Sequence, residues 1–367
     1  NISINAGQEF ARNIKARLSA NYVFSESKNR TVQGGNDPNV LAGTVMGLPR
    51  NISNQDLKDN FRDPETGDQN TLTNFTNNPW WITTQNGFNN DVERFFGSLD
   101  LSWQTLDWLS FSMNAGTDFF TENRIQRSRP GTLGFETGAF SNDRIQSREI
   151  DVDFMASINK DLSEDFNIKG NIGHNTNVRR RERFSNSATN LTDPSLFTFA
   201  NANSNTPTNN LTTQRLIGIY GDLTFGYQNE LFLNVTGRND WSSTLPKDNN
   251  SFFYPSASLS YIFTESLEID SDILSYGKLR ASISEVGSDE NPFQLDFRFF
   301  PTSNQFGQFG TDITFPFNGL NAFGATGTIP PQDLQPEETI TLEFGTELQF
   351  YDGRLGIDFT WYDEDTE

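Results

Sequence analysis

The 367-residue chain contains no cysteine and only one histidine, His174. Without cysteine, neither a disulfide framework nor a thiolate metal site can form. A single histidine excludes a two-histidine metal centre, and the missing thiol excludes Cys–His nucleophilic catalysis. We expect no metal and no cofactor.

Positive charge and long hydrophobic runs are also scarce. The chain has 27 Lys and Arg against 48 Asp and Glu, a formal charge of −21, so nucleic acid is not an expected partner. A membrane helix needs about 20 mostly apolar residues in a row, and polar residues interrupt every apolar stretch here. The N-terminus lacks the basic and apolar regions of a signal peptide. Both ends have the pattern of strand interiors, so we expect a segment of a longer protein.

Alternation of polar and apolar residues with a period of two is abundant, and it is typical of strands with two unlike faces. Over 94–103 the apolar face holds Phe95, Gly97, Leu99, Leu101 and Trp103, and the polar face holds Arg94, Ser98, Asp100 and Ser102. The same pattern recurs over 109–119, 150–158, 257–263 and 340–350. No segment of comparable length follows the helical period, so the predicted fold class is all-β.

The pattern predicts about twelve strands, joined alternately by short and long connections. The strands lie near 1–8, 14–26, 91–103, 108–120, 148–158, 166–178, 213–227, 231–238, 253–263, 277–286, 337–350 and 355–363. The long connections, rich in Asn, Asp, Gly, Pro, Ser and Thr, are 27–90, 121–147, 179–212, 239–252 and 287–336. Successive antiparallel strands turn at opposite ends, so all long loops fall on one rim of the sheet.

This asymmetry is expected of a transmembrane β-barrel in a bacterial outer membrane, which has short periplasmic turns and long extracellular loops. The polar faces, with residues such as Ser98, Asp100 and Asn114, would line the interior, and the apolar faces would meet lipid. The alternative is a soluble secreted β-sandwich that binds or hydrolyses glycans. In a sandwich, two stacked layers would bury the apolar side chains of Leu99, Phe111, Phe154 and Leu342 against each other.

Five sequence blocks resemble the SusC/RagA-type TonB-dependent transporters. They are NPWW (78–81), LFLNVTGRNDWSS (231–243), FYPSASL (253–259), KLRAS (278–282, with Gly287 after it) and LQPEET (334–339). The resemblance implies a barrel of 22 strands, of which residues 1–367 would supply about 12, with the plug and terminal strands outside this segment. It also implies import of glycan or peptide oligomers, a SusD-like surface lipoprotein as partner, and energy from the TonB–ExbB–ExbD complex. Trp241 stands where the family usually has glycine.

Paired carboxylates could in principle act as the acid and base of a glycosidase. The candidate pairs here are Asp63 with Glu65, Asp289 with Glu290, and Glu337 with Glu338. Neighbouring residues rarely converge on one substrate, and solvated acidic loops explain them better. We therefore expect no catalytic residue and no enzyme. The stretch 63–68 is rich in oxygen ligands but lacks the spacing of an EF-hand loop.

Tryptophans in the predicted extracellular loops are the candidate ligand-binding residues. Trp80, Trp81 and Trp241 could stack on the rings of a passing oligosaccharide, and the alternative is packing within the loops or against the lid lipoprotein. The run Arg179-Arg180-Arg181 begins a predicted extracellular loop, where guanidinium groups would meet phosphates of lipopolysaccharide or an anionic substrate. Membrane lipid and lipopolysaccharide are thus further expected partners.

Overall fold

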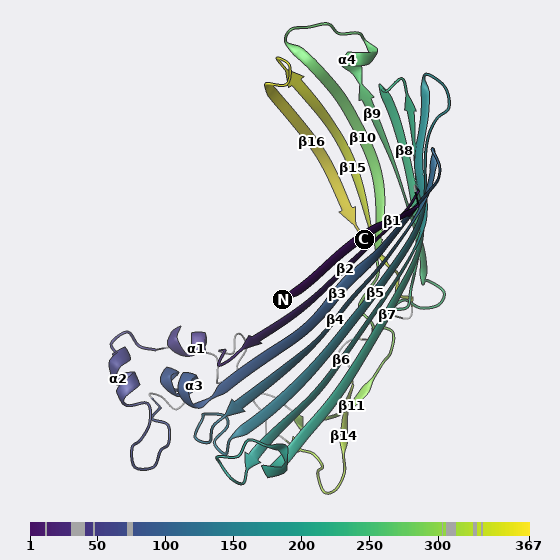
Figure 1. The fold of residues 1–367 in the computed structure, drawn as a ribbon. Helices are drawn as coiled ribbons and strands as arrows, with labels where there is room; N and C mark the ends of the chain where they lie inside the picture. Colours follow the sequence, from purple (N-terminus) through teal and green to yellow (C-terminus); the bar gives the residue numbers. More distant parts are fainter. Residues whose placement is uncertain are drawn as a thin grey trace.

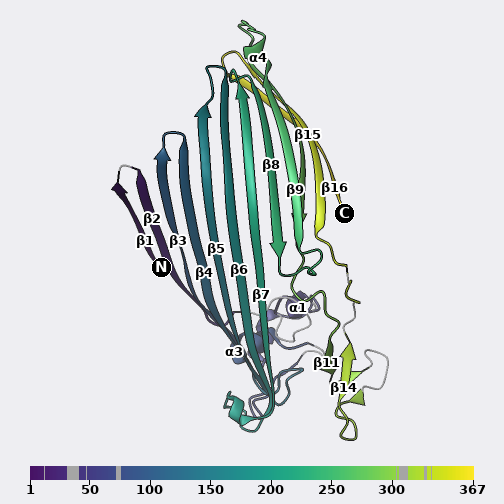
Figure 2. The same cartoon turned by 90° about the vertical axis from the view of Figure 1, so that its right-hand side faces the viewer.

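A single antiparallel sheet of 12 strands dominates the structure. The computed structural model describes residues 1–11, 13–30, 41–46, 48–71, 76–302, 304–305, 313–325, 329–331 and 333–367. The strands follow one another in chain order, β1-β2-β3-β4-β5-β6-β7-β8-β9-β10-β15-β16. Figures 1 and 2 show them as one long, bent and twisted wall without a second layer. The all-β prediction is confirmed.

The strands of the large sheet are long. They are β1 (Ile2–Ala11), β2 (Ile14–Ser27), β3 (Gly87–Leu106), β4 (Leu109–Ser128), β5 (Ala139–Asp161), β6 (Phe166–Leu191), β7 (Ala202–Tyr227), β8 (Leu231–Ser242), β9 (Ser251–Ile262), β10 (Leu274–Ser288), β15 (Glu337–Phe350) and β16 (Leu355–Thr366). The described connections add the short hairpins β11 (Phe299–Thr302) with β14 (Ala322–Ala325) and β12 (Asn304–Gln305) with β13 (Ile313–Thr314). The helical elements are α1 (Leu41–Met46), α2 (Asn54–Asp59), α3 (Pro79–Gln85), η1 (Phe199–Asn201) and α4 (Phe263–Ser266).

Two of the predicted long loops are largely strand. Residues 121–147 contribute to β4 and β5 and leave a connection of only 129–138, and residues 179–212 contribute to β6 and β7 and leave 192–201. These segments are polar on both faces, which looks like loop composition. Each strand nevertheless pairs with its neighbour throughout, as Arg144 does with Phe184, so the backbone groups are satisfied beyond the apolar region. Local composition could not reveal this pairing.

The other long connections also differ in detail from the prediction. The connection predicted at 239–252 is 243–250, because β8 continues to Ser242 and β9 begins at Ser251. The connection predicted at 27–90 carries α1–α3 and ends where β3 begins, and that predicted at 287–336 carries β11–β14; both lie in part outside the described residues. The helices α1–α3 lie at one end of the wall and α4 at the other (Figure 1).

The apolar face of the sheet is open, which contradicts the sandwich alternative. Leu99, Phe111, Phe154 and Leu342 keep 37%, 41%, 48% and 37% of their surface exposed. In a sandwich these side chains would be buried between two layers. Large apolar side chains left in contact with the surroundings along whole strands are expected where the surroundings are lipid.

A small core lies at the end of the wall, beside the helices. Leu57 of α2 and the α3 residues Trp81 and Ile82 are buried there. Asn78 caps α3 by accepting a hydrogen bond from the Trp80 N–H, and Pro79 occupies the first turn, where it needs no donor. Among the described residues, no helix has the length and apolarity to cross a bilayer.

Candidate functional site on the polar face of the sheet

The strand register gathers the polar side chains on one face. Asp100 of β3 lies opposite Asn114 of β4, and Asp153 of β5 lies opposite Asn175 of β6. Because side chains alternate along a strand, each such pair shares a face with residues two positions away. The polar halves of neighbouring strands therefore meet in one continuous hydrogen-bonding surface.

A ladder of carboxylates lies at the centre of this face. Glu149, Asp151 and Asp153 occupy alternate positions of β5, and Asn175 and Asn177 oppose them from β6. The Asn177 side-chain amide donates to Glu149 at 2.8 Å and to Asp151 at 3.0 Å, and the Asn175 amide donates to Asp151 at 3.3 Å. Asparagine amides thus separate like charges. We call these five residues the carboxylate ladder.

Tyr220 of β7 links the carboxylate ladder to the next strands. Its hydroxyl donates to Asp153 at 2.8 Å. The ring lies across Gly173 of β6, where an added Cβ would come within 2.3 Å of the Tyr220 Cζ. Only glycine at position 173 leaves room for a tyrosine lying flat on the sheet.

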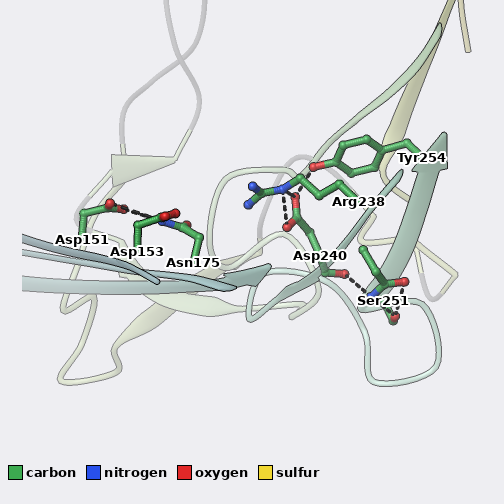
Figure 3. Close-up of polar contacts among 8 residues, drawn as sticks. Asp151, Asp153, Asn175, Arg238, Asp240, Ser251 and Tyr254 are labelled. Atoms are coloured by element: carbon green, nitrogen blue, oxygen red, sulfur yellow. Dashed lines mark hydrogen bonds and ion pairs between the residues drawn. The ribbon is translucent and has the colours of Figure 1, made fainter. Parts of the chain in front are cut away.

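Beyond Tyr220 lies a cluster of Arg238, Asp240 and Tyr254. The Arg238 Nε donates to Asp240 at 2.8 Å, and the Tyr254 hydroxyl donates to the same carboxylate. The Arg238 guanidinium also lies 5.5 Å from the centre of the Tyr220 ring. Figure 3 shows this cluster on the same side of the sheet as Asp151, Asp153 and Asn175 of the carboxylate ladder. The polar surface is thus continuous from β5 to β9.

A groove of roughly 350 Å³ runs beside the carboxylate ladder toward β2. Its lining includes Ser98, Gly116, Asp118, Glu149 and Asp151. The acceptors and donors here suit a polar solute that exchanges its water for protein hydrogen bonds. Among the described residues, no cluster of three or more His, Asp or Glu side chains is arranged to hold a metal ion.

The three candidate tryptophans lie in different environments. Trp81 is fully buried (0% exposed), and its indole N–H donates to Thr132 at 2.9 Å. Its side chain is covered by protein and offers no free ring face here, and ligand stacking by Trp81 stays a prediction. Trp80 is half-buried, donates to Asn54 and lies 5.1 Å below the Lys58 ammonium.

Trp241 is not in a loop. It belongs to β8 and pairs with Ile217 of β7, on the face that also carries Val235 and Leu233. It is 37% exposed on the apolar face, away from the carboxylate ladder. The register therefore places Trp241 where an aromatic side chain would meet lipid, and the three tryptophans do not form one site.

The arginine run is split between the two faces of β6. Arg179 pairs with Glu149 on the polar face, at 2.9 Å. Arg180 lies opposite Arg148 on the apolar face. His174 also lies on the apolar side, 3.0 Å from the Thr176 hydroxyl. The sequence interpretation expected the arginines of the run to act together at one surface. Side chains alternate between the two faces of a strand, so consecutive arginines cannot do so.

The paired carboxylates serve local structure. Asp63 accepts the backbone N–H groups of Glu65 and Thr66, at 2.8 and 2.9 Å, and closes a turn. These donors lower the pKa of Asp63, with the Thr66 N–H contributing most. Asp289 accepts hydrogen bonds from Ser242, Thr244 and Gln214.

Sequence reasoning missed the carboxylate ladder, although a signal was present. In Glu149-Ile150-Asp151-Val152-Asp153-Phe154, an acid occupies every second position of an otherwise apolar strand. The prediction used the apolar half of this pattern to find the strand. The acidic residues of the pattern indicate the opposite, polar face. Which Asn, Tyr and Arg side chains they contact depends on the register between strands.

Comparison with protein families identifies the family to which this sheet belongs. The model of the family described as TonB dependent receptor-like, beta-barrel, matches residues 20–367. The chain belongs to this family. As part of a TonB-dependent receptor barrel it is an outer-membrane protein, and in such barrels the apolar face meets lipid while the polar face lines the interior.

Two curated relatives are TonB-dependent receptors of Formosa agariphila. Receptor P26 is 24% identical over 364 residues, which cover 95% of this chain and 34% of P26. Receptor P3 is 24% identical over 163 residues, which cover 44% of this chain and 15% of P3. The chain thus spans about a third of the length of P26.

Two solved structures, one of a transporter and one of a receptor, share the fold. The RagAB peptide transporter superposes with a TM-score of 0.79 at 14% identity, covering 99% of this chain and 40% of that one. BauA, the ferric preacinetobactin receptor of Acinetobacter baumannii, superposes with a TM-score of 0.51 at 12% identity, covering 99% and 46%. At these identities the likeness concerns the arrangement of strands.

Proposed function

We propose that this chain is a wall segment of a TonB-dependent transporter that imports glycan or peptide oligomers across the outer membrane. The observation that carries the proposal is a single sheet with opposite chemistry on its two faces. Aliphatic side chains stay exposed on one face, and the carboxylate ladder, Tyr220 and the Arg238 cluster cover the other. A sheet of this kind separates the hydrocarbon of a membrane from the polar interior of a barrel.

The sheet is open, because β1 and β16 are not paired with each other. An open strand edge in hydrocarbon leaves backbone groups without partners, at a cost of several kcal/mol for each group. We propose that further strands of the transporter close the wall into a barrel of 22, with the long connections on the extracellular side. A SusD-like lipoprotein would cover that side, and the TonB–ExbB–ExbD complex would supply energy.

The interior face suits an oligomer rich in hydroxyl or amide groups. Aspartate, glutamate and asparagine side chains hydrogen-bond sugar hydroxyls and peptide N–H groups equally well. The comparison structure RagAB is described as a peptide transporter, which supports a peptide as one of the two substrate classes. Trp80, half-buried beside Asn54 and Lys58, is our candidate for contact with the ligand or the lipoprotein.

Uptake by cells that carry the complete transporter tests this function. Glu149→Gln, Asp151→Asn and Asp153→Asn together remove the charge of the carboxylate ladder but keep its shape. A control changes Glu164→Gln and Asp352→Asn, which lie in short turns away from the polar face. We expect uptake of labelled oligomers to fall several-fold in the first variant only, with equal amounts of protein in the outer membrane. Uptake that persists without TonB would contradict the proposal.

Co-purification from the same cells tests the partner separately. We expect the tagged transporter to bring down one surface lipoprotein in stoichiometric amount, and the Trp80→Ala variant to weaken this complex or the affinity for the oligomer. A transporter that imports oligomers but purifies alone would remove the lipoprotein from the proposal.

A further inference from the structure

On three neighbouring strands, an outward-facing arginine directly follows an aliphatic residue of the apolar face. On β5 Ile150 is followed by Arg148, and on β6 Val178 is followed by Arg180. On β7, Ile217 is followed by Arg215. All three side chains are exposed. We call Arg148, Arg180 and Arg215 the arginine triad.

The register brings the triad together. Arg148 and Arg180 are direct cross-strand partners, so their Cα atoms are about 5 Å apart. Arg180 pairs with Thr213 of β7, which places Arg215 on the adjacent diagonal, about 7–8 Å away. Like charges directly opposite one another in a sheet are destabilising. A bound anion would therefore stabilise this arrangement.

The protein itself supplies little negative charge here. The Arg180 guanidinium lies 3.7 Å from Glu182, while Arg148 and Arg215 have no carboxylate within ion-pair distance in the described part of the chain. The acid next to Arg148 in sequence, Glu149, points to the opposite face and is paired with Arg179. In a chain of net charge −21, three neighbouring arginines with a single paired carboxylate are a local exception.

Below the triad, the apolar face offers room for hydrocarbon chains. A shallow groove is lined by Phe154, Ile172 and Ile219, among others. At about 3.4 Å per residue, Phe154 lies roughly 20 Å along β5 from Arg148, and Ile219 about 14 Å along β7 from Arg215. These distances match the reach of an acyl chain whose phosphorylated headgroup sits at the arginines.

We infer that the arginine triad binds the phosphate groups of lipopolysaccharide in the outer leaflet. Guanidinium forks bind phosphate oxygens in a bidentate manner, and such contacts are strongest at the edge of a low-dielectric layer. Arg148, Arg180 and Arg215 face the headgroups, and Phe154, Ile172 and Ile219 face the acyl chains. The choice of leaflet rests on the proposed function, because it assigns the long connections to the outside.

The test uses the complete transporter in phosphatidylcholine nanodiscs, titrated with fluorescent lipopolysaccharide. The triple variant Arg148→Gln, Arg180→Gln, Arg215→Gln should bind about fivefold more weakly for each arginine lost, or roughly a hundredfold overall. The control variant Arg17→Gln, Arg50→Gln, Arg354→Gln removes the same charge from exposed arginines elsewhere and should change binding less than twofold. Dephosphorylated lipid A should bind the native protein as weakly as the triple variant binds lipopolysaccharide.

Each contrary result has a distinct meaning. Equal binding by the native protein and the triple variant overturns the inference, as does an equal loss in the control. Displacement of the lipid by millimolar inorganic phosphate would show a simple anion site. A preference for phosphatidylglycerol would put the triad in the other leaflet. The single variant Arg148→Gln, expected to bind about fivefold more weakly, serves if the triple variant does not fold. Lipid binding is read without transport, so loss of uptake alone leaves this inference standing.

Discussion

The two faces of the wall treat arginine differently. On the polar face, Arg94, Arg179 and Arg238 each form an ion pair with a carboxylate of the same or a neighbouring strand, and Arg280 of β10 reaches across β15 to Asp358 of β16. On the apolar face, Arg148 and Arg215 have no such partner among the described residues. The difference teaches that these four interior arginines are neutralised by carboxylates of the protein, whereas Arg148 and Arg215, at the edge of the apolar face, are left for anions of the membrane.

The largest effect on stability is expected from a charge placed at the centre of the apolar face. Leu99→Arg should lower the free energy of unfolding of the complete barrel by about 2–4 kcal/mol, because the guanidinium would lie in hydrocarbon. Ser98→Arg, one residue away on the polar face, should change it by less than about 0.5 kcal/mol. Denaturant unfolding in lipid vesicles measures both. Equal losses would show that the two faces do not see different solvents.

A smaller effect is expected from closing the space under Tyr220. Gly173→Ala would place a methyl group 2.3 Å from the Tyr220 Cζ, so the ring must lift and lose its bond to Asp153. We expect a loss of about 1–2 kcal/mol in the free energy of unfolding. Gly116→Ala is the control on the same face, since the added Cβ would be 3.9 Å from its nearest neighbour, the Gly97 carbonyl oxygen. A loss of similar size in the control would assign the effect to the backbone instead.

Arg179 of β6 and Arg148 of β5 should respond to substitution with opposite signs. In a neutral detergent, Arg179→Gln removes the ion pair with Glu149 and should lower the free energy of unfolding by about 0.2–1 kcal/mol. Arg148→Gln relieves the repulsion from Arg180 without removing an ion pair and should raise it by a few tenths of a kcal/mol. Thermal unfolding of both variants in one detergent makes the comparison. The same sign for both would mean that Arg148 and Arg180 do not repel each other.

The smallest effect lies off both faces, in the turn closed by Asp63. The pKa of Asp63 is lowered below its ordinary value of 3.8 by the Thr66 and Glu65 N–H groups. The turn is therefore stabilised above pH 3.8, and this stabilisation is lost as the pH falls through the lowered pKa. Amide exchange at Glu65 and Thr66 should quicken over that range without a change in global unfolding. Asp63→Asn should remove the pH dependence, and a dependence that persists would assign it to another group.

Much of the architecture was predictable from the sequence, because alternation is a local property. The segment from Arg94 to Trp103 reveals its two faces without any neighbour, and the order of the strands follows from short connections between them. The ends of β5 and β6 were not predictable in this way. Around Arg144 and Phe184 both faces are polar, and only pairing between the two strands keeps these residues extended.

The site residues show the same division. The ring of Trp81 is covered because the 129–138 connection brings Thr132 against it, 51 residues away in sequence. Trp241 was expected in a loop, and the extension of β8 to Ser242 turned it toward the apolar face. A single sequence cannot fix such placements, because they depend on where strands stop and on what packs beside them.

By itself, the sequence determined that the chain is all-β, that its strands have one polar and one apolar face, and that acidic residues outnumber basic ones. The tertiary structure alone decided which polar groups meet: Asp153 with Tyr220, and Arg148 with Arg180. The physical reason is that alternation is written into consecutive residues, whereas register is a relation between strands. A shift of one position would send every one of these side chains to the other face.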